Sequence, residues 1–171
     1  MIKTYPKKIL PVAKKIENFL IEDGRAFSYK PDFNMFSFDL KTKNEGRYKE
    51  LDMDIYVREN EYTVYAYVKF RLPVSDTDLM LRMSEFICRA NKKAIDGCFE
   101  LNWQKGYIRY KYHVKCLGDN LPTKKMFKDS IIAPEFMFEK FFMGMDLIID
   151  YLMDAKSAFE VCMKQWYKAA V

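Results

Sequence analysis

Histidine, glycine and proline are scarce in this chain of 171 residues, which has one histidine, six glycines and six prolines. A single imidazole excludes a histidine-rich metal site and any chemistry that needs a pair of histidines. So little glycine and proline, beside an aromatic content of 16%, excludes collagen-like and low-complexity character. The four cysteines are scattered without a Cys-x-x-Cys pair, and we expect them to be reduced thiols in a cytoplasmic protein.

Long uncharged apolar segments are also missing. The most apolar stretch, residues 136–153, contains Glu139, Lys140, Asp146 and Asp150, so we expect no membrane span. The chain opens with no apolar stretch of the kind that a signal peptide needs. No Gly-rich phosphate loop, Gly-x-Ser-x-Gly elbow or His-Glu-x-x-His motif occurs, and we expect no catalytic residue, cofactor or metal.

What the chain does contain is enough apolar material for one folded domain, residues 1–171. Half of the residues are hydrophobic and 31% are charged, a composition typical of globular proteins. The formal net charge of +5 equals the number of lysines among the first fifteen residues, which contain no acid. This local excess favours a solvated basic end over a nucleic-acid or lipid surface. The lysines are Lys3, Lys7, Lys8, Lys14 and Lys15.

Hydrophobic periodicity predicts an α+β chain with the element order α-β-β-β-α-β-β-α. Apolar residues at helical spacing follow Pro11 up to Gly24, and they recur after the capping sequence at residues 75–78. Helix is expected again beyond Pro122 to about Tyr167, interrupted or bent at Pro134. Alternation with a period of two predicts strands in residues 34–40, 50–57, 62–71, 99–103 and 108–114.

The alternating segments fit a half-buried antiparallel meander. Turns centred on residues 44–45 and 59–60 keep every apolar side chain on one face. A two-residue turn at residues 105–106 would join the last two strands. The pairs expected opposite one another are Phe38 with Leu51, Met53 with Ala66, Ile55 with Val64, Glu50 with Lys69, Leu101 with Tyr110, Glu100 with Lys111, and Cys98 with His113.

The long helix before Leu152 has an apolar arc too wide for one sheet to cover. Either the segment from Ala155 to Tyr167 folds back on it, or a second subunit covers it. Both alternatives remain open from the sequence.

Carboxylates at regular spacing raise two hypotheses. Asp146, Asp150 and Asp154, with Glu139, could chelate Mg²⁺, but a solvated helix face is favoured, its repulsion offset by lysines such as Lys124, Lys125 or Lys128. Asp52 and Asp54 would lie about 7 Å apart on one strand, a spacing that some hydrolases use. We favour an open, hydrated sheet face for this pair as well, because perturbed carboxylates need burial.

The expected pairing of Cys98 with His113 gives the sharpest enzymatic hypothesis, since a thiol beside an imidazole can become a thiolate nucleophile. No helix N-terminus or oxyanion donor is expected beside it, so a structural role is favoured.

Aromatic and basic residues alternate on the sheet face away from the first two helices, and this face is our candidate site. It could bind a protein or peptide, be covered by the C-terminal helix, or stack single-stranded nucleic acid, which is the least favoured because no Lys/Arg-Gly-Phe strand motif occurs. The candidate partner-binding residues are Met35, Tyr56, Tyr65, Tyr67, Lys69 and Arg71.

The element order, Asn91, and the segments Gly97-Cys98-Phe99-Glu100-Leu101 and Gly106-Tyr107-Ile108-Arg109-Tyr110 resemble the YbjN-like family, which shares the fold of Tir-type secretion chaperones. The resemblance implies a five-stranded antiparallel sheet packed by helices, no catalytic residues, a tendency to form homodimers, and chaperone-like binding of an extended client segment. The segment 155–168 is an addition to the minimal pattern, and the basic character of the chain differs from the acidity typical of secretion chaperones.

Taken together, these patterns predict a non-catalytic protein-binding module, chaperone-like or regulatory. The alternative is a small-molecule-binding domain or weak enzyme, and the third hypothesis is single-stranded nucleic-acid binding.

Overall fold

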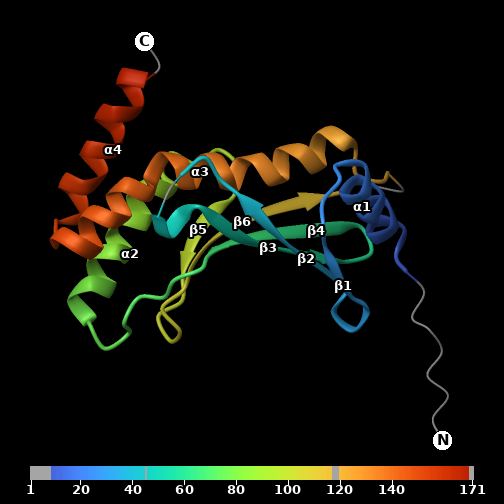
Figure 1. Ribbon diagram of the computed structural model, residues 1–171, viewed down its shortest axis with the longest axis horizontal. Helices are drawn as coiled ribbons and strands as arrows, with labels where there is room; N and C mark the ends of the chain where they lie inside the picture. The colour runs from blue at the N-terminus through green and yellow to red at the C-terminus, as the bar shows by residue number, and fades with distance from the viewer. Residues whose placement is uncertain (1–8, 45, 117–119, 170–171) are drawn as a thin grey trace, which may run out of the picture.

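The computed structural model describes residues 9–44, 46–116 and 120–169. Lys3, Lys7 and Lys8 of the expected basic end, and Glu45 of the expected first turn, lie outside the described residues. The fold is α+β, as the periodicity predicts (Figure 1). The helices are α1 (Pro11–Glu22), α2 (Thr77–Asn91), α3 (Lys124–Tyr151) and α4 (Ala155–Ala169), with short 3-10 turns η1 (Pro31–Phe33) and η2 (Gly46–Tyr48). The strands are β1 (Ser28–Lys30), β2 (Met35–Lys41), β3 (Glu50–Val57), β4 (Glu61–Val68), β5 (Cys98–Leu101) and β6 (Ile108–Lys115).

The strands form one open antiparallel sheet in the order β1-β2-β3-β4-β6-β5. The expectation of five strands is wrong, because Ser28–Lys30 adds a sixth at the edge beside β2. Three residues followed by a proline give no alternating pattern, so β1 has no signal in the sequence. It is held by Tyr29, whose ring lies 4.5 Å from that of Phe36.

The expected registers of β2 with β3 and of β5 with β6 are each wrong by two residues. The expected register of β3 with β4 is confirmed. Phe38 lies opposite Met53, not Leu51, whereas Met53 faces Ala66 and Ile55 faces Val64 as expected. In the second hairpin Leu101 faces Ile108 and Glu100 faces Arg109, because a wider loop replaces the two-residue turn. Asn102 organises that loop by accepting hydrogen bonds from the backbone of Gln104 and Lys105. A slip of two residues keeps each side chain on its face, so the buried set is still correct.

The helices α2 and α3 pack against one face of the sheet, and α1 packs on α3. Figure 1 shows α3 running along the sheet, with α1 at one end and α2 and α4 gathered at the other. In strands β3 and β4 every second side chain is buried, which gives one apolar face. Aromatic contacts join the layers: the ring of Phe99 on β5 lies 5.1 Å from that of Phe138 on α3. None of the helices in the described part of the chain is long and apolar enough to cross a membrane.

Helix α3 continues through Pro134, so of the two outcomes expected there, an interruption or a bend, the interruption is wrong. Its residues before and after the proline are buried against the sheet, including Phe127, Ile131 and Phe138. A buried hydrogen bond from the Tyr62 hydroxyl of β4 to Ser130 Oγ, at 3.3 Å, fixes the helix over the sheet beside the proline. Tertiary contacts on both sides therefore stabilise the helix where proline removes one backbone hydrogen bond.

Helix α4 folds back on α3 and α2, which confirms the first of the two alternatives for the wide apolar arc. The chain reverses at Leu152, which has a left-handed φ of 54°. Ala158 and Cys162 of α4 are buried, and the ring of Phe159 stacks on Phe141 at 5.9 Å. Because α4 lies on the helical side of the molecule, it does not cover the opposite face of the sheet.

Asn91, the last residue of α2, closes the edge of β5. Its side-chain amide accepts a hydrogen bond from the Phe99 backbone N–H at 2.6 Å and donates one to the Phe99 carbonyl at 3.0 Å. These two bonds imitate a neighbouring strand and occupy backbone groups that an edge would otherwise offer for pairing.

We expect Asn91→Ala to lower the free energy of unfolding by roughly 1–3 kcal/mol, because two part-buried backbone groups lose their partner. It should also promote aggregation, since the edge of β5 becomes available for pairing. Urea denaturation and light scattering measure the two effects. Asn91→Asp, which keeps the acceptor and loses the donor, should fall between the wild type and Asn91→Ala in stability, and equal stability of all three would contradict the role.

Candidate functional site on the open face of the sheet

The sheet face opposite the helices carries three rows of side chains that cross the strands. The register places Asp39, Asp52, Tyr67, Arg109 and Glu100 side by side in the first row. The second row is Ser37, Asp54, Tyr65, Lys111 and Cys98, and the third is Met35, Tyr56, Thr63 and His113. Acids therefore lie on β2 and β3 and, as Glu100, on β5, tyrosines lie on β3 and β4, and bases lie on β6.

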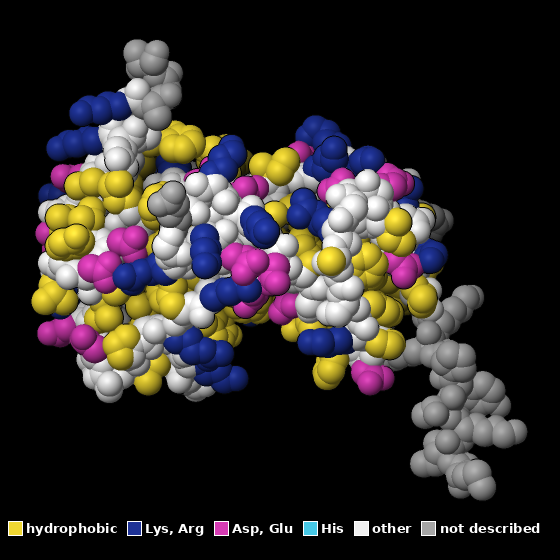
Figure 2. All heavy atoms as spheres, in the orientation of Figure 1, with side chains coloured by type: hydrophobic (Ala, Val, Ile, Leu, Met, Phe, Trp, Pro, Cys, Tyr) yellow, Lys and Arg dark blue, Asp and Glu magenta, His cyan; other side chains and the backbone are white. Residues whose placement is uncertain are grey.

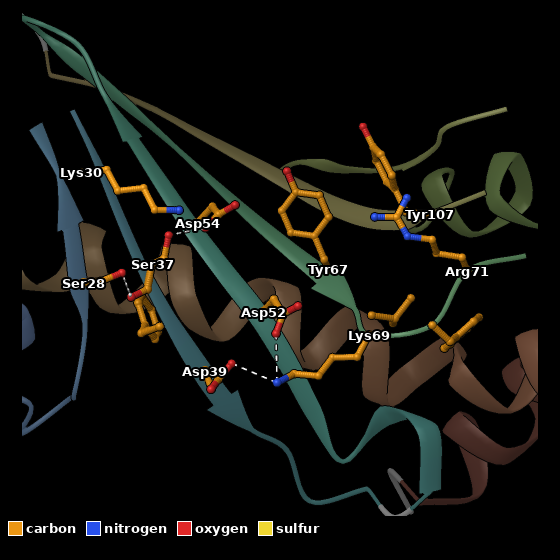
Figure 3. Close-up of a pocket in the computed structure, with 13 residues that line it drawn as sticks. Ser28, Lys30, Ser37, Asp39, Asp52, Asp54, Tyr67, Lys69, Arg71 and Tyr107 are labelled. Carbon is orange, nitrogen blue, oxygen red and sulfur yellow. Dashed lines mark hydrogen bonds and ion pairs between the residues drawn. The ribbon is translucent and has the colours of Figure 1, made fainter. Parts of the chain in front are cut away.

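Lys69 neutralises much of the acidic half. Its ammonium lies 2.8 Å from Glu50, 3.0 Å from Asp52 and 3.1 Å from Asp39. Figure 3 shows it reaching toward Asp39 and Asp52 across the strands. The hydrogen bond to Glu50, followed by those to Asp52 and Asp39, raises the pKa of Lys69. Lys69 thus holds the ends of three strands together and stays charged.

Arg109 organises the tyrosines. Its guanidinium lies 4.1 Å from the centre of the Tyr65 ring, donates to the Tyr67 hydroxyl at 3.2 Å, and binds Glu100 at 2.6 Å. Burial works against its charge, but the bonds to Tyr67 and Glu100 outweigh burial and raise its pKa. The ring of Tyr107, in the loop before β6, lies 5.6 Å from that of Tyr67. The aromatic centre of the face is therefore ordered by one permanent cation.

At the other end of the face, the only histidine of the chain binds neighbouring strand residues. His113 Nδ1 lies 3.0 Å from Thr63 Oγ1, and Nε2 lies 3.5 Å from Glu61. Glu61 also accepts a hydrogen bond from Arg58 at 3.0 Å.

Two open hollows lie on this face. The first, of about 530 Å³, extends over Asp52, Asp54, Tyr67 and Tyr107 (Figure 3). The second, of about 610 Å³, is lined by Tyr56, Tyr65, Arg109, His113 and the exposed ring of Phe33. Both are surface depressions of the sheet, lined by tyrosines and by charges of both signs.

Five of the six candidate residues lie at the solvent-facing surface of this face or its rim. Tyr56 and Tyr65 contact each other edge to face at 5.7 Å, and Tyr65 and Tyr67 lie 6.2 Å apart. Arg71 lies at the rim, 5.9 Å from the ring of Tyr107. Met35 is on the same face but only 6% exposed, beside Lys30 and Tyr56, so it offers little contact surface.

Sequence reasoning missed Tyr107, Arg109 and Lys111 as members of this face. Arg109 and Lys111 have the same alternation on their strand as Tyr65 and Tyr67 on theirs. This alternation could have assigned Arg109 and Lys111 to the open face from the sequence. Tyr107 precedes the strand, and only the loop geometry brings it to the tyrosines.

The expected Cys98–His113 pair is not formed. Cys98 lies opposite Lys111, because the wider loop shifts the hairpin by two residues, and His113 binds Thr63 and Glu61 instead. Burial, followed by the charge of Glu100, raises the pKa of Cys98, which is the opposite of what a thiolate nucleophile needs.

We expect iodoacetamide at about pH 7 to modify Cys98 more slowly than the exposed Cys88, because burial and a raised pKa both reduce the accessible thiolate. Mass spectrometry of digested protein over a time course measures both sites. Cys88→Ser provides the control, and rapid labelling of Cys98 in that variant at about pH 6 would contradict an inert thiol.

The carboxylates Asp52 and Asp54 do not form a paired acid and base. Asp52 binds Lys69 at 3.0 Å, whereas Asp54 accepts a hydrogen bond from Ser37 at 2.7 Å. Each carboxylate is therefore held by a different neighbour on the sheet.

The carboxylates Asp146 and Asp150 of α3 form ion pairs that join the helix to the rest of the fold. Arg47, from the loop before β3, binds both oxygens of Asp150 at 2.7 Å and lies 3.2 Å from Asp146. The offsetting cation is thus Arg47, not the lysines expected from the sequence. Asp154 instead accepts the backbone N–H of Ser157 at the start of α4. Within the described residues, no group of three or more His, Cys, Asp or Glu side chains is placed to hold a metal ion.

We expect Arg47→Ala to lower the free energy of unfolding by about 1 kcal/mol at neutral pH, since the pair is partly exposed. Burial already raises the pKa of Asp146, and losing the opposing Arg47 charge should raise it further. A carboxyl with a raised folded-state pKa stabilises the fold below its ordinary pKa, and this contribution is lost as pH rises through the folded value.

The deficit of Arg47→Ala should therefore shrink as pH falls from about 7 to about 4. Urea denaturation at both pH values measures this change. Arg58→Ala removes an exposed arginine and serves as the matched control. A deficit that grows on acidification would contradict the assignment.

No family model matches the chain, and no curated protein or solved structure is significantly similar to it.

Proposed function

We propose that this protein is a non-catalytic protein-binding module, chaperone-like or regulatory, whose open sheet face contacts a partner protein or an extended peptide. The observation that carries the proposal is the ordered cluster of partly exposed tyrosines around Arg109, on a face that the described helices leave open. Tyrosine and arginine are enriched at protein interfaces because each offers apolar area together with a polar end. As part of this proposal, we infer that the chain is related to YbjN-like proteins and Tir-type secretion chaperones. We also infer that it is located in the cytoplasm.

The order already present in the face favours binding. Tyr67 and Arg109 are held by a hydrogen bond, and Tyr56, Tyr65 and Tyr107 contact their neighbours edge to face or stack near the guanidinium. Side chains that are fixed before binding lose less conformational entropy when a partner arrives. The face is therefore suited to contact by rings and fixed polar groups.

Strand addition at β5 is disfavoured as the mode of contact. The Asn91 side chain already occupies the backbone N–H and carbonyl of Phe99 on that edge. A partner would accordingly contact the face of the sheet, rather than extend it beside β5.

The alternatives are less well supported. A polyanion would meet Asp39, Asp52 and Asp54 on the acidic half of the face, which opposes single-stranded nucleic acid. Figure 2 likewise shows acidic and basic side chains intermixed on the side of the molecule that it presents. A small-molecule site usually encloses most of its ligand, whereas both hollows lie open on the sheet.

We expect Tyr65→Ser combined with Tyr67→Ser to abolish capture of the partner while lowering the free energy of unfolding by no more than about 2 kcal/mol. Affinity capture of the tagged protein from its native lysate, followed by mass spectrometry, compares wild type and variant with and without nuclease.

Tyr151→Ser, which removes a 74% exposed tyrosine at the end of α3, is the matched control. Equal capture by the wild type and the double variant would contradict the proposal. Capture that disappears on nuclease treatment would indicate that the face binds nucleic acid instead of a protein.

A further inference from the structure

We propose that the partner which the open face recognises is a second copy of this chain, docked face to face about a two-fold axis parallel to β4. The inference rests on the proposed function, because it takes the open face to be a protein-contact surface. It adds the identity of one partner and the symmetry of the contact.

The charges on the two strands beside β4 are arranged antisymmetrically about it. In the second row, Asp54 on β3 and Lys111 on β6 lie on either side of Tyr65. In the first row, Asp52 and Arg109 lie on either side of Tyr67. Each of these two rows therefore reads acid, tyrosine, base from β3 to β6, and these three positions read backwards are their own electrostatic complement.

A two-fold axis along β4, in the plane between two facing sheets, exchanges the two sides of each row. Asp54 of one copy then meets Lys111 of the other, Asp52 meets Arg109, and Tyr65 meets Tyr65 near the axis. An isologous contact needs this kind of self-complementary patch. Facing sheets pack with their strands within about 30° of each other, so the match is best on the strands nearest the axis, which carry these charges.

The outer positions of the rows do not oppose the arrangement. In the second row Ser37 would face Cys98, which brings no charge together. In the first row Asp39 would approach Glu100, but Lys69 binds Asp39 at 3.1 Å and Arg109 binds Glu100 at 2.6 Å within each copy. Each of these two acids thus has a cation beside it within its own copy.

Lys111 and Asp54 remain available for an intermolecular pair. Among the described residues, the one acid that forms an ion pair with Lys111 is Glu100, at the long distance of 3.8 Å. Asp54 is held by the neutral hydroxyl of Ser37 rather than by a cation. A second copy supplies the opposite charge to both residues at once.

The size of the face fits a reversible dimer. The six strands lie about 4.8 Å apart and have between three and eight residues, at about 3.3 Å per residue, so together they cover about 600 Å² per copy. The total of about 1,200 Å² is at the low end of stable interfaces. We therefore expect a dimer that forms at high micromolar concentration, dissociates on dilution, and weakens as salt screens the pairs.

Charge reversal tests the symmetry directly. In a dimer of Asp54→Lys, each new lysine would face Lys111, and in a dimer of Lys111→Asp, each new aspartate would face Asp54. We expect each variant alone to dimerise at least about tenfold more weakly than the wild type. An equimolar mixture should restore the dimer, because both intermolecular pairs in the mixed species join opposite charges. Sedimentation velocity over a dilution series measures all four samples.

Lys128→Asp, on an exposed position of α3, should dimerise like the wild type and controls for the change in net charge. Circular dichroism and thermal unfolding show that each variant is folded. If Asp54→Lys does not fold, Tyr65→Arg replaces it, since the axis would bring two arginines together and should likewise prevent dimerisation.

The inference is overturned by a wild type that is monomeric throughout the dilution series, or by a dimer that both reversals leave intact. The proposed function has a separate readout. A monomeric wild type whose captured partner is lost with the Tyr65 and Tyr67 substitutions would refute the second copy and retain a different protein partner. A dimer that each charge reversal weakens and the mixture restores, without any other captured protein, would support the inference and limit the function to self-association.

Discussion

The packing of α3 along one face of the sheet is the contact on which the rest of the structure depends. It buries Phe138 against Phe99 of β5, and the Tyr62–Ser130 hydrogen bond fixes its position. Helices α1, α2 and α4 then pack around α3 on the same side. Because the apolar residues of each strand alternate with polar ones, this one-sided burial leaves the polar set on a surface of its own.

That surface is stabilised from side to side rather than by a covering layer. Lys69 joins carboxylates of β2 and β3 to the end of β4, and Arg109 joins β6 to Tyr67 on β4 and Glu100 on β5. The same bonds that hold neighbouring strands together give the face its acidic and basic halves and its ordered rings. The same contacts therefore stabilise the sheet and order the contact surface. For this reason we propose that the open face is the functional site, rather than α3, where Arg47 neutralises the acids.

The faces of the strands were predictable, but their registers were less so. Alternation of apolar residues assigns Met53 and Tyr110 to the core whatever the exact pairing, because a two-residue slip changes no face. The pairing of Cys98 with His113 required the loop length as well, and the Asn102 loop made that length different. Strand β1 escaped prediction because three residues are too few to show a period.

The sequence by itself determined the α+β class, the order of the longer strands and helices, the buried side of each long strand, and the tyrosines and lysine of the open face, because these follow from local periodicity. Only the tertiary structure decided that α4 folds onto the helical layer and leaves that face open, that Arg47 reaches the acids of α3, and that Arg109 lies among the tyrosines. These contacts join residues far apart in the chain, and their partners are selected by packing and distance, which no local pattern encodes.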